Sequence, residues 1–88
     1  MNAEERLEYA GYDGVRYLAG YSYDDALIGV TEDGRAVYNY EIMIEWLMKK
    51  EGWTDNEAVE WIDYNVIRAL PYMGKTSPII MYPLPYYN

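Results

Sequence analysis

The stretch ALIGVTEDGRAVYNYEIMIEWLMKKE, residues 26–51, contains the change of periodicity that decides the fold. Two runs rich in apolar residues, at 26–30 and 35–39, flank a polar turn at 31–34. Gly34 closes this turn and can adopt the positive φ that a tight connection between two strands requires. The sequence therefore predicts a β-hairpin over residues 26–39.

Helical periodicity begins directly after the hairpin, over residues 40–51. Glu41, Glu45 and Lys49 recur every four residues and mark one face of a helix. Ile42 and Trp46 widen the apolar arc beyond what a surface helix needs. This helix is therefore either central in the fold or presents an apolar flank to another molecule.

A second helix is predicted from about residue 54 to 70. Thr54 and Glu57 have the spacing of a capping box, and Pro71 disfavours a helical conformation in the residue before it. A further strand is predicted at 79–82. Because a hairpin followed by helices argues against a doubly wound sheet, the expected fold is α+β. In it a small antiparallel sheet, made of the hairpin 26–39 and strand 79–82, packs on two consecutive helices (about 40–51 and 54–70).

The 88 residues fit a single domain spanning 1–88. Residues 1–12 are expected to hold a short, frayed helix, because a segment of two turns is marginal by itself. Residues 15–18 are expected to form a short strand, and residues 83–88 an extended tail.

The composition excludes several classes of site. With 7 Lys+Arg against 15 Asp+Glu the net charge is −8, and the chain has no His and no Cys. Disulfide scaffolds, thiolate or imidazole metal sites and most catalytic triads are therefore excluded. No phosphate-binding loop or EF-hand spacing is present. We expect a protein that is not an enzyme and uses no cofactor.

Charge also bears on partners and location. A chain at −8 is poorly suited to bind nucleic acid directly, or an anionic membrane, because phosphate contacts need Lys or Arg. No targeting signal is visible, and no apolar run is long enough to cross a bilayer. A cytoplasmic protein is expected, in the cytoplasm of the host cell if the chain is viral.

Carboxylates recur along both predicted helices, roughly one helical turn, or ~5–6 Å, apart, which approaches the spacing of phosphates along a nucleic-acid strand. Such a face could occupy a groove lined with Lys and Arg. The other interpretation is a solvated helix face, because Glu is a good helix former. The acids concerned are Glu41, Glu45, Asp55, Glu57, Glu60 and Asp63.

Tyrosine is unusually abundant, with 12 Tyr and no Phe. Tyr is enriched at recognition surfaces because it combines rigid area with a hydrogen bond. We expect four to lie in the core: Tyr17, Tyr38, Tyr40 and Tyr64. For the terminal clusters, core and partner surface both remain open; these are Tyr9, Tyr12, Tyr21, Tyr23, Tyr82, Tyr86 and Tyr87.

Residues 26–30, 33–38, 63–74 and 78–80 resemble segments of small bacterial and prophage proteins. In size, acidity and lack of catalytic residue types, the chain also resembles phage anti-CRISPR and other counter-defence inhibitors. This resemblance implies a non-enzymatic inhibitor of a basic, nucleic-acid-handling host protein such as a CRISPR effector.

The residues predicted to bind this protein partner are Glu41, Glu45, Asp55, Glu57, Glu60, Asp63, Trp46, Tyr86 and Tyr87. The alternative is an accessory or self-assembling domain, for example a homodimer. Its interface would include Ile42, Trp46 and the tail at 83–87, because these form the candidate apolar patch.

Overall fold

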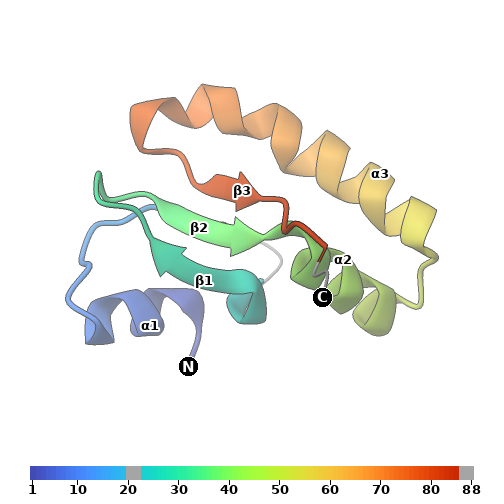
Figure 1. Ribbon diagram of the computed structural model, residues 1–88, viewed down its shortest axis with the longest axis horizontal. Helices are drawn as coiled ribbons and strands as arrows, with labels where there is room; N and C mark the ends of the chain where they lie inside the picture. The colour runs from blue at the N-terminus through green and yellow to red at the C-terminus, as the bar shows by residue number, and fades with distance from the viewer. Residues whose placement is uncertain (20–22, 86–88) are drawn as a thin grey trace.

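The computed structural model describes residues 1–19 and 23–85, which form an α+β fold (Figure 1). The helices are α1 (Ala3–Tyr9), α2 (Tyr40–Glu51) and α3 (Asp55–Asn65). Two segments are 3-10 helical: η1 (Asp24–Ala26) and η2 (Ile67–Thr76). The strands are β1 (Leu27–Val30), β2 (Ala36–Asn39) and β3 (Ile79–Met81).

The sheet has the order β1-β2-β3, with β2 in the centre. The predicted hairpin is confirmed: β1 and β2 are antiparallel, and Gly34 adopts a φ of 82° in the connection. The third strand instead runs parallel to β2, with Val37 opposite Ile79. The prediction of a wholly antiparallel sheet is therefore wrong at β3, and the sheet is mixed.

The helices explain the direction of β3. A parallel partner needs a crossover of a dozen or more residues, and α2, α3 and η2 provide it. In Figure 1, α3 and η2 lie on the β3 side of the sheet, and α1 lies on the β1 side. The hydrophobic periodicity of residues 40–70 predicts the helices. It does not predict at which end of the sheet β3 begins, and therefore does not predict the direction of β3.

The predicted helix over 40–51 is confirmed residue for residue. Asn39 caps its first turn by accepting a hydrogen bond from the Ile42 N–H at 3.2 Å. Gly52 ends it in the left-handed region at φ 71°. α2 packs against α3, η1 and β2, which makes it the central helix of the fold.

The second helix starts at the predicted capping box but stops at Asn65, short of the predicted end near residue 70. Pro71 lacks an N–H, and its ring clashes with the carbonyl four residues earlier, that of Ile67. The chain from Ile67 on therefore tightens into the 3-10 segment η2. A kink at Gly74, with φ 82°, divides η2 near its end.

The N-terminal helix α1 was expected to be frayed because of its short length. Tertiary contacts instead stabilise it. Asn2 and Glu5 form a capping box that was not predicted. The Ala3 N–H donates to Asp24 Oδ1 at 2.7 Å, and the Arg6 guanidinium donates to the Asp24 carbonyl. Ala3 and Leu7 are buried. α1 is thus docked through η1.

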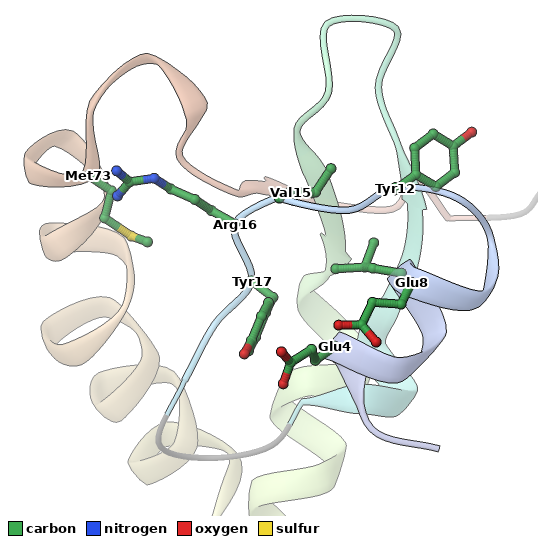
Figure 2. A pocket seen from close by; sticks show the side chains of 9 residues that line it. Glu4, Glu8, Tyr12, Val15, Arg16, Tyr17 and Met73 are labelled. Carbon is green, nitrogen blue, oxygen red and sulfur yellow. The ribbon is translucent and has the colours of Figure 1, made fainter.

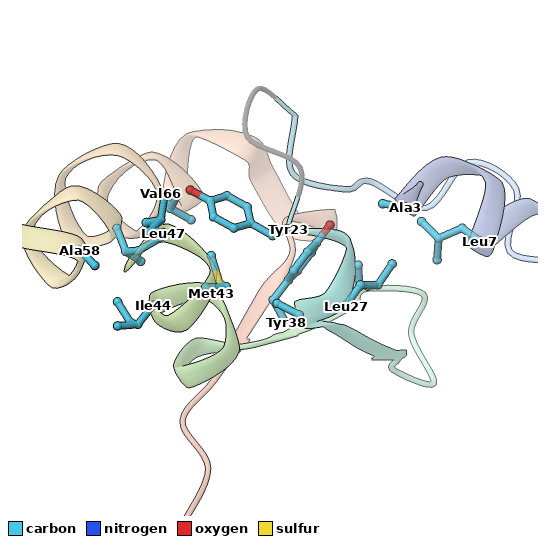
Figure 3. Packing of buried hydrophobic residues seen from close by; sticks show 13 residues of the cluster. Ala3, Leu7, Tyr23, Leu27, Tyr38, Met43, Ile44, Leu47, Ala58 and Val66 are labelled. Atoms are coloured by element: carbon cyan, nitrogen blue, oxygen red, sulfur yellow. The ribbon is translucent and has the colours of Figure 1, made fainter. Parts of the chain in front are cut away.

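One core joins these elements (Figure 3). Tyr38 on β2 is fully buried, as predicted, together with Met43 and Leu47 of α2 and Ile62 of α3.

The prediction of a strand at residues 15–18 is wrong, because these residues have no strand conformation. The Leu18 N–H donates instead to Tyr38 Oη at 3.1 Å, so a side chain takes the place of a partner strand.

We expect Tyr38→Phe to lower the free energy of unfolding by about 1 kcal/mol, because the half-buried Leu18 N–H loses its acceptor. Urea unfolding of the full chain measures this. Tyr9→Phe is the control, since Tyr9 is 86% exposed and should change nothing. Equal stability of the two variants would contradict this role of the Tyr38 hydroxyl.

The pH profile of the same variants tests the burial of the phenol. Burial is the main cause that raises the pKa of Tyr38 above its ordinary value of 10.0. The unfolded chain therefore releases this proton at a lower pH than the folded chain does. The stability that the neutral phenol contributes is complete below pH 10 and is lost as the pH rises above it. The loss should be smaller in Tyr38→Phe.

Candidate functional site

The six helix carboxylates predicted as a partner surface are all exposed. Within residues 1–19 and 23–85, none of the six forms an ion pair with Lys or Arg. One of them has a local role: Glu57 Oε1 accepts the Thr54 N–H at 2.9 Å, which completes the capping box of α3. Their charge is therefore directed mainly toward solvent.

α3 carries two stripes of side chains. Ala58 and Ile62 are buried in the core, and so is Val66 at the C-terminal cap. A second stripe, formed by Glu57, Glu60, Trp61 and Tyr64, combines carboxylates and aromatic rings at the spacing i, i+3, i+4 and i+7, which places all four on one side of the helix. Trp53, just before the Thr54 cap, adds a further ring beside them. These residues and Asn65 line a surface groove of about 420 Å³, called here the aromatic-acidic groove: Trp53, Glu57, Glu60, Trp61, Tyr64 and Asn65.

The aromatic residues of this groove contact one another and their neighbours. The rings of Trp53 and Trp61 lie 5.5 Å apart at 50°, and both residues are half-buried. The Asn65 amide donates to the Trp61 carbonyl at 3.0 Å. The Arg68 guanidinium lies 4.8 Å from the centre of the Tyr64 ring. The groove therefore has an aromatic wall with exposed carboxylates beside it.

The prediction that Tyr64 belongs to the core is wrong, because it is 69% exposed. Tyr64 follows Ile62 by two residues, or about 200° around the helix, so it cannot share the core stripe. The groove was not predicted, because the acids and the aromatic residues were considered as two separate patterns. The helical spacing of Glu57, Glu60, Trp61 and Tyr64 was the signal.

The remaining acids of α3 face another way. Asp55 and Asp63 lie toward Tyr40, the first residue of α2. Burial is the largest cause that raises the pKa of Tyr40. Smaller electrostatic effects come from Asp63, Tyr82 and Asp55, in that order. The Tyr40 and Tyr82 rings lie 4.7 Å apart. The predicted row of acids is thus divided between two sides of the helix.

Trp46 lies half-buried at the contact between α2 and Tyr23. The two rings meet edge to face, with centroids 5.5 Å apart, and the Lys50 ammonium lies 4.9 Å from the centre of the Trp46 ring. Tyr23 is itself buried, at 3% exposure. Trp46 therefore contributes to packing. The other aromatic residues predicted for the partner surface, Tyr86 and Tyr87, lie outside the described residues.

A second acidic hollow, also of about 420 Å³, lies beside α1 and was not predicted (Figure 2). The carboxylates of Glu4 and Glu8, one turn apart, point toward Tyr17, whereas Arg16 extends toward Met73. The charge of Glu4 raises the pKa of the Tyr17 phenol most, with smaller effects from burial, a hydrogen bond to Glu4 and the charge of Glu8. Docking of α1 creates this hollow.

The described part of the chain contains no group of three His, Cys, Asp or Glu side chains that could hold a metal ion. Within the same residues, no helix combines the length and apolarity needed to cross a membrane. Comparison with protein-family models, with curated proteins and with solved structures finds no match for this chain.

Since Glu57 closes the capping box, we expect Glu57→Lys to lower the free energy of unfolding by about 1 kcal/mol. Glu57→Gln should retain nearly full stability, because Gln can also accept the Thr54 N–H. Thermal unfolding measures both variants. Glu60→Lys is the control for charge, since this exposed side chain has no capping role, and its effect should stay within about 0.5 kcal/mol. Equal losses for the two lysine variants would exclude a special role of Glu57.

Proposed function

We propose that this protein is a non-catalytic inhibitor that binds a basic, nucleic-acid-handling protein, with CRISPR effectors as the class of target. The observation that carries the proposal is the outward charge of α2 and α3. Six exposed carboxylates, unpaired within the described residues, lie on two adjoining helices of a chain with a net charge of −8. Such a surface is complementary to a groove that binds phosphates.

The arrangement on α3 supports mimicry of a nucleic acid over a short distance. Glu57, Glu60 and Asp63 follow one another at three-residue intervals, a rise of about 4.5 Å each. Each step also turns by about 60° around the helix, so the three charges wind across its surface. A duplex likewise presents charges that wind around an axis. The aromatic-acidic groove adds contact area that does not depend on salt.

A charge-neutral variant of α3 tests the proposal against CRISPR effectors, with guide-dependent nucleic-acid binding measured by fluorescence anisotropy. The parent should abolish this binding by the target effector at one equivalent. Glu57→Gln, Glu60→Gln and Asp63→Asn together should slow association at least about tenfold at low salt, with a smaller difference at high salt. Gln at position 57 preserves the capping box.

The matched control removes three charges elsewhere: Glu5→Gln, Asp13→Asn and Glu32→Gln. Both triple variants change the net charge from −8 to −5, so they differ only in where the charge is lost. All three control side chains are exposed, and Gln at position 5 keeps the capping box of α1. Equal inhibition by both variants, or inhibition of no effector by the parent, would contradict the proposal.

Self-assembly is the competing proposal, and the observation that favours it lies at β3. This strand is at the edge of the sheet, and edge strands can pair with a second copy. A groove of about 550 Å³ runs beside it, with Ile67 and Leu70 of η2 facing Ile79 and Ile80 of β3. A copy docked here would cover this apolar wall.

Light scattering over a dilution series tests self-assembly. If it occurs, the dimer fraction should rise with salt, because salt screens the repulsion between copies that each carry −8. Leu70→Lys should restore the monomer. Tyr72→Lys, at a residue that is 92% exposed and not in the groove, should not. A monomer at every concentration and salt would exclude this alternative.

A further inference from the structure

The aromatic-acidic groove of α3 combines two features that together favour one class of ligand. The faces of Trp and Tyr rings attract cations, and two carboxylates stand beside these rings. Neither Glu57 nor Glu60 has a Lys or Arg partner within the described residues. A cationic side chain from another molecule would therefore meet both a ring surface and an opposite charge.

The protein itself shows how a cation sits at one of these rings. The Arg68 guanidinium lies 4.8 Å from the centre of the Tyr64 ring, within the range of a cation–π contact. Tyr64 is still 69% exposed with Arg68 in place, so much of its surface stays accessible. The Tyr64 ring thus already contacts one guanidinium, and its exposed surface can contact a second one.

The geometry favours arginine over lysine. A guanidinium is flat, weakly hydrated and able to stack on aromatic faces while it donates several hydrogen bonds, whereas an ammonium is a compact, strongly hydrated charge. Because the Asn65 amide nitrogen donates to the Trp61 carbonyl, the Asn65 Oδ1 is left as an acceptor at the groove. Glu57 uses Oε1 in the capping box, which leaves Oε2 as a second acceptor.

We propose that this groove binds an arginine side chain of the partner and anchors the complex there. The inference rests on the proposed function, because the partner is expected to carry arginines that contact phosphates. Fifteen acids attract any basic surface, whereas the groove would select a particular side chain on it. It thus adds specificity to an attraction that charge alone leaves general.

Blocked tetra-arginine and tetralysine peptides of equal charge are the probes. Nuclear magnetic resonance of the three Trp indole N–H groups in the full chain gives a readout at known positions. The arginine peptide should shift the signals of Trp53 and Trp61 and leave that of Trp46, which lies on α2 against Tyr23. Its affinity should exceed that of the lysine peptide by about two- to fivefold.

Two pairs of variants locate the interaction. Tyr64→Ala should weaken binding of the arginine peptide about two- to fivefold, and Tyr64→Phe should not, because it keeps the ring face. Glu60→Gln should weaken binding more than Glu45→Gln, which removes the same charge from α2 outside the groove. Equal affinity for both peptides, equal shifts of all three indoles or no effect of Tyr64→Ala would overturn the inference.

The two proposals can fail separately. If the charge-neutral α3 variant loses inhibition while Tyr64→Ala inhibits like the parent and the groove ignores arginine, this inference is wrong and the proposed function stands. If the groove selects arginine while the parent inhibits no effector, the site stands and the proposed function is wrong.

Discussion

The contact between the Tyr38 hydroxyl and the Leu18 backbone connects segments that secondary structure alone would leave apart. Tyr38 lies in the central strand, fully buried, and its ring fills the space between the sheet and α2 (Figure 3). By accepting the Leu18 N–H, it orders an irregular segment that has no strand partner. The segment carries Tyr17, and through it the hollow beside α1 takes its shape. A phenylalanine would fill the same volume without this second function.

Much of the fold was predictable because its signals are local. The hairpin, α2 and the capping box at Thr54 follow from turn residues, four-residue periodicity and capping chemistry, each of which spans fewer than about 15 residues. The direction of β3 was not predictable, since it depends on where the crossover helices return the chain. The docking of α1 also rests on a distant residue, Asp24.

The candidate site was predictable in composition more than in arrangement. Reading the carboxylates as helix-face residues correctly places all six on the surface. On α3, the division of the four carboxylates between the aromatic-acidic groove and the side near Tyr40 depends on the rotation of the helix about its axis, which packing of Ala58 and Ile62 sets. Tyr64 was assigned to the core because aromatic residues are usually buried, although its angular position excludes that.

The parallel register of β2 and β3 also bears on the order of folding. Arg35 and Ser77, which meet where the two strands begin, are 42 residues apart in the chain. Closing a loop of that length costs more conformational entropy than closing the hairpin, and it precedes any gain from strand pairing. We expect the hairpin and α2 to form first, and β3 to join once the crossover helices are in place. On opening, β3 should detach before the hairpin, and its amides should exchange hydrogen faster than those of the central strand β2.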